Sequence, residues 1–372
     1  MRALFIVNTY FQLITALQIK HSLFAKDSCV LLISDHSNDA MRVAEHLNEE
    51  NEFEEVHYIR SKGHVKNRSL YVMIKEFVEI STGKKTNSYS HYLYGITELY
   101  FDRILFYNFD IDIYGIYSIL SSYNKEIECC SFEEGIFSYF NTYSHTEKFR
   151  LTRLARKAFG KPDLHKNFSC FYCFYPEFYH GKLKTIRIPR IDKTDPWMSK
   201  ILGRIFEASY TTDYSKYKYM FFESVFETEG TSINELKMID VIADIVGKEN
   251  LLIKQHPRST VTYFRDNGFN IDSNSNLPFE SVHLNTDLSG ICFISALSGS
   301  TVSTNLIIDD QSKTIFIYPL MDYEKYEKIR NYIDNTKTVI DDLIQKQYLK
   351  CAWIVHDTDE LKEALASPTD KC

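Results

Sequence analysis

The sequence predicts an α/β protein of two domains with a cleft between them. The chain has 372 residues, and domains of about 100–200 residues make two the natural number. Short apolar runs alternate with helical patterns over the first third, and this alternation resumes after about residue 215. Such alternation is typical of βα units with a mostly parallel sheet. We therefore expect two Rossmann-like domains, over residues 1–210 and 211–372, that bind ligands at the carboxyl ends of their strands.

Apolar runs predict the strands of the first domain. The opening run is interrupted by Asn8 and Thr9, so it is predicted to be a first strand rather than a secretory segment. The run from Cys29 to Ser34 is apolar almost throughout, as in a strand buried on both faces. The expected strands are 4–7, 29–34, 55–59, 103–107 and 127–132, and the expected helices are 11–23, 38–48, 69–79 and 113–122.

The segment from about residue 140 to 210 is less regular and carries two basic stretches, 148–161 and 182–193. The first stretch alternates cations with apolar residues. This pattern favours a solvated helix face and is also compatible with contact on an anionic membrane. Cys170 and Cys173 have CxxC spacing, but no second ligand pair accompanies them, so we expect no zinc site.

The second domain repeats the alternation of strands and helices. The apolar run before Ser298 leads into a hydroxyl-rich turn where a helix is expected to begin. The expected strands are 219–224, 251–254, 281–283, 291–297 and 314–318, and the expected helices are 233–245, 300–308, 324–331 and 358–366.

Charge and hydropathy exclude several classes of protein. The net charge is -7, which disfavours nucleic acid as the main partner because phosphate backbones bind basic faces. No stretch approaches about 18 uninterrupted apolar residues, so no transmembrane helix is expected. We expect a cytoplasmic protein with reduced thiols. A location at the inner face of the membrane, peripheral membrane contact and a homodimer stay open.

The first candidate site is Lys254-Gln255-His256-Pro257-Arg258, at the carboxyl end of an expected strand. Proline favours an extended conformation for His256. In an extended segment Lys254, His256 and Arg258 share one face, and three potential cations on one face indicate an anion site. A histidine there can hydrogen-bond a phosphate or protonate it as it leaves.

The second candidate site is the hydroxyl-rich turn with Ser298, Gly299, Ser300 and Thr301. Ser300 or Thr301 is a good N-cap, and the amino end of a helix offers free N–H groups to a phosphate. Gly299 allows a ligand to come close. The spacing is not that of a Walker loop.

The third candidate site is Glu133-Glu134-Gly135, which follows the strand expected at 127–132. Adjacent carboxylates at a strand end suit a general base, one holding the geometry while the other accepts a proton. Thr9 and Gln12 follow the first expected strand without phosphate-binding glycines, so a dinucleotide site is disfavoured there. We expect Thr9, Gln12 and Gly135 to line the cleft.

Together these motifs resemble those of bacterial sialyltransferases, in particular the lipooligosaccharide and capsular polysaccharide type. That family has a [D/E]-[D/E]-G motif, then an HP motif, then a Ser/Thr pair, and here they read Glu133-Glu134-Gly135, His256-Pro257 and Ser300-Thr301. The opening Thr9–Leu13 resembles a further family segment, with Tyr10 in place of proline. Asp is more frequent in the family where this chain has Glu133 and Glu134.

The resemblance implies a GT-B-type glycosyltransferase that moves sialic acid from CMP-sialic acid, with inversion, to a sugar hydroxyl of a capsular or lipooligosaccharide glycan, lipid-linked or free. It implies Glu134 as the base, with Glu133 beside it, and His256 at the leaving phosphate. The residues expected to hold that phosphate are Lys254, Pro257, Arg258, Ser298, Gly299, Ser300 and Thr301. A monophosphate leaving group requires no metal, and no cofactor is expected.

Three alternatives stay open. Glu229, which follows the first strand of the second domain, is a reserve candidate for the base. A transferase of the same fold that uses a UDP-hexose is the main alternative function, and a DxD pair, Asp110 and Asp112, would then hold a metal ion. A binding protein that retains the fold without catalysis is the third alternative, and intact Glu134 and His256 argue against it.

Overall fold

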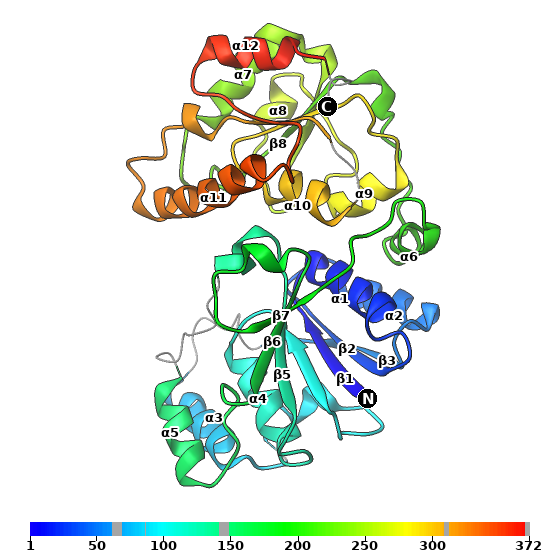
Figure 1. Ribbon diagram of the computed structural model, residues 1–372, viewed down its shortest axis with the longest axis vertical. Helices are drawn as coiled ribbons and strands as arrows, with labels where there is room; N and C mark the ends of the chain where they lie inside the picture. Colours follow the sequence, from blue (N-terminus) through cyan, green and yellow to red (C-terminus); the bar gives the residue numbers. More distant parts are fainter. Residues whose placement is uncertain (62–68, 86, 141–148, 309–311, 369–372) are drawn as a thin grey trace. The chain divides into compact units, whose positions relative to one another are not determined.

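The computed structural model describes residues 1–61, 69–85, 87–140, 149–308 and 312–368. The chain divides into two compact units, Met1–Pro189 and Arg190–Cys372, each built on one parallel sheet (Figure 1). Lys148, at the start of the first basic stretch, lies outside the described residues. Among the described helices, none combines the length and apolar character that crossing a bilayer requires.

The first unit contains a seven-stranded sheet in the order β3-β2-β1-β4-β5-β6-β7. Every neighbouring pair is parallel. The reversal of strand order beside β1 is that of a doubly wound α/β fold, in which ligands bind where the order reverses. Its strands are β1 (Arg2–Val7), β2 (Ser28–Ser34), β3 (Glu55–Ile59), β4 (Arg103–Phe106), β5 (Glu128–Phe132), β6 (Phe168–Cys173) and β7 (Lys184–Arg187).

Helices cover both faces of this sheet, which explains why its central strands are apolar almost throughout. In Figure 1, α1 and α2 cover one face and α3 and α4 the other. Phe5 of β1 is fully buried and makes edge-to-face contacts with Phe24 and Phe53. The helices are α1 (Tyr10–Ser22), α2 (Ala40–Glu50), α3 (Leu70–Thr82), α4 (Ile111–Leu120) and α5 (Arg150–Ala158).

The expectation of an irregular segment from about residue 140 to 210 is wrong for β6 and β7, which extend the first sheet. Prolines and basic residues around these two short strands obscured the strand pattern. Cys170 lies in β6 and its thiol donates a 2.9 Å hydrogen bond to the thiol of Cys130 in β5. The described residues contain no cluster of three or more His, Cys, Asp or Glu side chains that could hold a metal ion.

The division between the units falls at Pro189 rather than near residue 210. The side chain of Arg190 donates hydrogen bonds of 3.1, 3.0 and 2.7 Å to the carbonyls of Asn305, Leu306 and Ile308. The helix α6 (Pro196–Ile205) packs on α9 (Phe279–Asn285) of the same unit. These contacts attach residues 190–210 to the second unit.

The second unit contains a six-stranded sheet in the order β10-β9-β8-β11-β12-β13, again parallel throughout. The strands are β8 (Tyr219–Phe222), β9 (Leu251–Lys254), β10 (Asn270–Ile271), β11 (Cys292–Ser295), β12 (Thr314–Phe316) and β13 (Ala352–Ile354). The remaining helices are α7 (Glu235–Val246), α8 (Tyr263–Asp266), α10 (Gly299–Ile307), α11 (Glu327–Gln345) and α12 (Thr358–Ala366). Figure 1 shows α7, α8 and α12 on one face and α9, α10 and α11 on the other.

The predicted strand at 281–283 is wrong, because these residues belong to α9. Ser281, Val282 and His283 are all buried, and so short a segment does not distinguish a strand from a buried helical turn. Phe279 and Val282 of this helix join the core formed by Phe222 and Phe293. The helix predicted at 324–331 is real but longer, since α11 runs from Glu327 to Gln345.

Candidate active site

Three adjacent strand ends of the first unit bring the predicted acceptor-side residues together. The strands β1, β4 and β5 are neighbours in the sheet. Thr9 follows β1, Tyr107 follows β4 and Glu134 follows β5. Because parallel strands have their carboxyl ends at one edge of the sheet, side chains from the loops beside α1, α4 and β5 meet there.

Glu134 is the partly exposed carboxylate of this group. Its Oε1 accepts a 2.9 Å hydrogen bond from the hydroxyl of Thr9, and Gln12 also hydrogen-bonds the carboxylate. The amide oxygen of Gln12 accepts the backbone N–H of Asn8 at 2.7 Å, which fixes the side chain. Burial raises the pKa of Glu134, and the hydrogen bonds from Thr9 and Gln12 partly lower it. The carboxylate is therefore held in position and partly desolvated.

Thr9 has two functions at this edge. Its hydroxyl accepts the backbone N–H of Gln12 at 3.2 Å as the N-cap of α1, and it donates to Glu134. Burial and the charge of nearby Glu134 raise the pKa of Tyr107 to about 12. Tyr107 is a neighbour of the carboxylate that the sequence did not single out.

Glu133 points into the unit, although it precedes Glu134 directly. The residue is 1% exposed, and its Oε2 accepts the hydroxyl of Tyr139 at 2.5 Å and the N–H of Phe174 at 2.9 Å. Burial raises the pKa of Glu133 to about 7. Glu133 therefore ties the turn after β5 to the end of β6.

Gly135 allows the chain to turn sharply after the two glutamates. Its φ is +71°, in the left-handed region that favours glycine, and a Cβ there would meet nothing within 4 Å. The backbone N–H of Glu134 donates to the hydroxyl of Ser138 at 2.6 Å, and the Gly135 carbonyl accepts from the Ser138 N–H. The glycine requirement is conformational, and the space beside it is open.

The predicted donor-side residues also follow adjacent strand ends, in the second unit. The strands β9, β8 and β11 are neighbours, and His256 follows β9 while Ser298 follows β11. Between them, Glu223 follows β8 directly. The order of this sheet reverses at β8, where ligands of doubly wound folds bind.

His256 begins a tight turn that Glu223 holds. The Ser259 N–H donates to the His256 carbonyl at 2.7 Å and closes the turn. The two carboxylate oxygens of Glu223 accept the His256 N–H at 3.0 Å and the Ser259 hydroxyl at 2.7 Å. Burial raises the pKa of Glu223. Glu223 was missed in the sequence, although its place at a strand end matches that of Glu133.

The imidazole of His256 has a defined tautomer. Its Nδ1 accepts the backbone N–H of Arg258 at 3.1 Å, so the ring proton of the neutral form lies on Nε2. Burial, followed by the charges of Arg258 and Lys254, lowers the pKa of His256 to about 4. Near neutral pH the imidazole is uncharged and can donate one hydrogen bond from Nε2.

The predicted common face of Lys254, His256 and Arg258 is wrong, because the chain turns at His256 instead of continuing extended. Lys254 is 6% exposed, and its Nζ donates to the carbonyls of Ser275 and Leu277 at 3.2 and 3.4 Å. Lys254 therefore supports the fold behind the turn.

Arg258 of this turn pairs with Glu229 of the loop between β8 and α7. The guanidinium of Arg258 is 3.4 Å from the carboxylate of Glu229, and both side chains are more than half exposed. The reserve candidate for the base thus has a cation beside it.

The hydroxyl-rich turn opens the nine-residue helix α10 at Gly299. Thr301 is fully buried and its hydroxyl donates to the Ser298 carbonyl at 2.8 Å, so it stabilises the turn. Ser298 and Ser300 are partly exposed, and the described contacts give their hydroxyls no partner. A Cβ on Gly299 would meet nothing within 4 Å. These groups and the helix N–H groups can hold an anion.

The DxD pair has structural partners in the first unit. Asp110 caps α4 by accepting the Ile113 N–H at 2.8 Å. Asp112 is 5% exposed and accepts the hydroxyls of Ser61 at 2.5 Å and Tyr92 at 3.0 Å. The short spacing of the pair reflects a helix start.

Comparison with known proteins identifies the family and the fold. A profile of the alpha-2,8-polysialyltransferase family matches residues 3–315, whereas no curated protein matches the sequence. Among solved structures, the chain resembles CalG4, the calicheamicin glycosyltransferase, with a TM-score of 0.50 and 8% identity over 99% of this chain and 90% of that one. It also resembles UGT89C1 of Arabidopsis thaliana in complex with UDP-L-rhamnose, with a TM-score of 0.48 and 11% identity over 100% of this chain and 90% of that one.

The likeness to CalG4 confirms the expected GT-B fold, with its two Rossmann-like domains. The family match confirms the expected sialyltransferase. The chain belongs to the alpha-2,8-polysialyltransferase family and is a glycosyltransferase.

Proposed function

We propose that this protein transfers sialic acid from CMP-sialic acid to the hydroxyl of a sialic acid at the end of a surface glycan, forming an α-2,8 bond with inversion. Sialyl transfer follows from the family, and the family's name supplies the linkage. In this proposal the first unit binds the acceptor glycan and the second unit binds the nucleotide sugar.

Glu134 is the proposed base. Its carboxylate accepts the proton of the acceptor hydroxyl, whose oxygen then forms a bond to the anomeric carbon of the donor sugar. The bond from that carbon to the phosphate oxygen breaks, and CMP leaves with the electron pair. Thr9 and Gln12 hold the carboxylate for this step. Its raised pKa improves proton acceptance, because a base works best with a pKa near the working pH.

His256 and the start of α10 are the proposed phosphate site. The Nε2–H of His256 can donate to a phosphate oxygen, and Ser298, Ser300 and the free N–H groups of α10 supply further donors. Negative charge grows on this phosphate as CMP leaves, so hydrogen bonds to it strengthen in the transition state. The same charge raises the pKa of the neutral imidazole and favours its protonation at that stage.

The observation that carries the proposal is the Glu134 carboxylate, partly exposed yet held by Thr9 and Gln12, in a member of a sialyltransferase family. The test is release of CMP from CMP-sialic acid in the presence of a sialylated acceptor. Glu134→Gln should lower turnover by about 10²–10⁴-fold, the usual loss for a general base. The control Glu229→Gln should stay active. The reverse result would move the base to Glu229.

The donor assignment has its own test, thermal unfolding in the presence of CMP, UDP or GDP. Of the three nucleotides, we expect only CMP to stabilise the protein. His256→Ala should abolish this stabilisation, while without nucleotide the variant should unfold at the same temperature as the wild type. A preference for UDP would refute the CMP donor and favour a UDP-hexose. Unchanged CMP binding in His256→Ala would refute the phosphate site.

A further inference from the structure

The helix α3 presents an apolar surface that nothing in the described structure covers. Its first two turns expose large apolar side chains, among them Leu70 at 71%, Tyr71 at 76%, Met73 at 54% and Ile74 at 55%. A surface helix of a globular protein normally turns such residues toward the core. A contiguous exposed apolar surface marks a contact with another molecule or a membrane.

The neighbouring helix α5 extends this surface. Leu151 is 73% exposed, Leu154 56%, and Phe159, directly after the helix, 58%. The buried Arg156 attaches α5 to α3, because its guanidinium donates to the carbonyl of Ile80 at the end of α3 at 2.6 Å. Figure 1 shows the two helices side by side. We call the exposed apolar side chains of these two helices the α3–α5 face.

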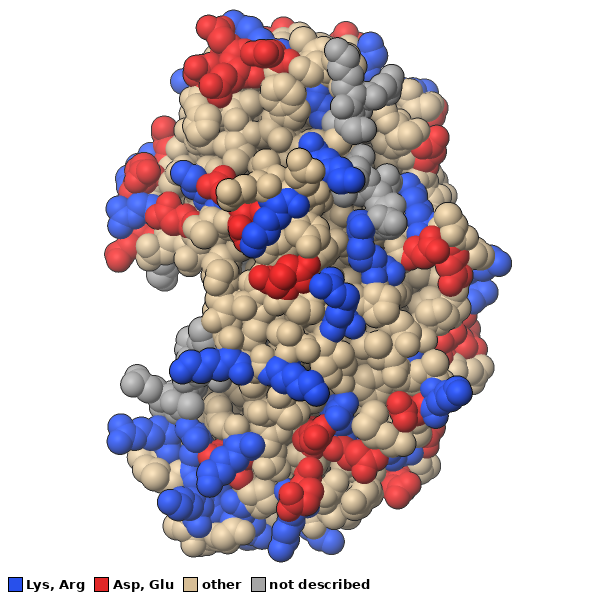
Figure 2. Space-filling model, in the orientation of Figure 1, with Lys and Arg blue, Asp and Glu red and all other residues tan. Residues whose placement is uncertain are grey.

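Cations surround the α5 part of this face. A hollow of about 720 Å³ beside α5 is lined by six basic and two acidic side chains: Lys125, Arg150, Arg153, Lys157, Lys161 and Lys166, with Glu126 and Asp163. Asp163 pairs with Arg153 at 3.0 Å, which leaves five cations and Glu126. Figure 2 shows several basic side chains at the lower left, where Figure 1 draws α5. The local excess of positive charge opposes the net charge of -7 for the chain.

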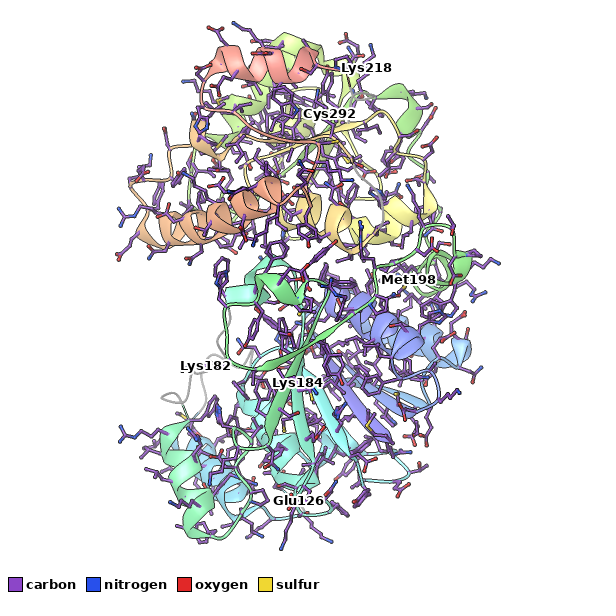
Figure 3. All side chains as sticks on the ribbon, in the orientation of Figure 1. Glu126, Lys182, Lys184, Met198, Lys218 and Cys292 are labelled. Atoms are coloured by element: carbon purple, nitrogen blue, oxygen red, sulfur yellow. The ribbon has the colours of Figure 1, made fainter. Side chains whose placement is uncertain are left out.

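The hollow lies away from the candidate active site within the first unit. Glu126, labelled in Figure 3, precedes β5 at its amino end, whereas Glu134 follows β5 at its carboxyl end. The reaction proposed for Glu134 therefore gives no reason for cations and exposed apolar side chains at this place.

We propose that the α3–α5 face docks the protein on a bilayer that contains anionic lipids. Apolar side chains of α3 and α5 enter the boundary between headgroups and acyl chains, and the cations of the hollow bind lipid phosphates. Cations flanking large apolar side chains are the composition of helices that lie in this boundary. An anionic glycan would need the cations but not exposed Leu70, Tyr71 and Ile74. A second copy of the chain would bring like charges together.

The test is co-sedimentation of the full chain with vesicles of equal parts phosphatidylcholine and phosphatidylglycerol, beside vesicles of phosphatidylcholine alone. We expect binding to the anionic vesicles only. Arg150→Gln with Lys157→Gln should weaken it about thirtyfold at low salt, since each surface cation is worth about fivefold. Lys337→Gln, an exposed cation of α11, is the control and should bind normally.

The apolar contribution has a matched pair of variants. Met73 on α3 and Met41 on α2 are both 54% exposed. Met73→Ser should weaken vesicle binding severalfold, and Met41→Ser should leave it unchanged. If Met73→Ser and Met41→Ser weaken vesicle binding equally, membrane docking is refuted. It is also refuted if binding depends on the cations but not on Met73, and the face then binds a polyanion. A dimer that Met73→Ser dissociates, with vesicle binding intact, would assign the face to a second copy.

Turnover on a soluble sialylated acceptor separates this proposal from the proposed function. All four variants should keep that activity, because they leave Glu134 and His256 untouched. Loss of vesicle binding with normal turnover supports docking alone. Normal vesicle binding by a chain without transferase activity would refute the proposed function and leave docking in place.

Discussion

Replacing Glu133 by glutamine should stabilise the first unit at alkaline pH and preserve activity, unlike the same change at Glu134. Burial raises the pKa of Glu133 from 4.5 to about 7. Below the lower value the carboxyl is protonated in the folded and unfolded chains alike. As pH rises, the unfolded chain ionises first, so folding loses stability until the folded pKa is passed. Glutamine mimics the protonated carboxyl and removes this loss.

The magnitude follows from the two pKa values. A group that shifts from 4.5 to about 7 makes the wild type lose about 2.5 kcal/mol relative to Glu133→Gln between about pH 5 and pH 8. Both tryptophans, Trp197 and Trp353, belong to the second unit, so their fluorescence does not report on the first. Hydrogen exchange of the Phe174 amide, which donates to Glu133, does.

The ratio of the Phe174 amide exchange rate in the wild type to that in Glu133→Gln should grow about 70-fold between about pH 5 and pH 8. Comparing the two proteins at each pH cancels the intrinsic exchange rate. A rate ratio independent of pH would refute the buried, pKa-shifted state of Glu133. A folded Glu133→Gln that is as inactive as Glu134→Gln would refute its structural role.

Two further predictions concern the second unit. Gly299→Ala should keep or raise stability, by up to about 1 kcal/mol from helix propensity, yet weaken CMP binding because the new Cβ enters the open space at the start of α10. Gly203→Ala in α6 is the matched helical control, and equal CMP affinities in both variants would contradict the assignment. Glu223→Ala leaves the N–H of His256 and the hydroxyl of Ser259 without an acceptor, at about 1–3 kcal/mol each. We expect a higher KM for CMP-sialic acid with kcat less affected, and a change in kcat alone would contradict a positioning role for Glu223.

Much of the architecture was predictable because both units follow a local rule. Parallel strands covered on both faces are apolar runs, and such runs identified β1, β2, β8, β9 and β11. The same rule fails for short elements. Ser281, Val282 and His283 belong to the seven-residue helix α9, which is too short to show a helical period, and β7 contains Lys184 and Arg187 at the edge of its sheet.

The roles within the motifs depended on side-chain direction, which spacing does not determine. Glu133 and Glu134 are adjacent and chemically identical, but the turn at Gly135 sends one inward to Tyr139 and the other toward Thr9. Lys254 is indistinguishable in sequence from a ligand-binding cation. It lies inside because both faces of its strand are covered.

The two units share one arrangement, in which a buried glutamate after a strand holds the turn that presents a proposed catalytic residue. In the first unit Glu133 fixes the turn that bears Glu134. In the second, Glu223 fixes the turn that bears His256. Each buried carboxyl loses hydration, which its raised pKa records, and each regains only part of that loss through two hydrogen bonds. A protein retains such a desolvation cost where the position of a side chain matters more than stability. Neutralising Glu133 should therefore stabilise the fold, and removing Glu223 should impair donor binding.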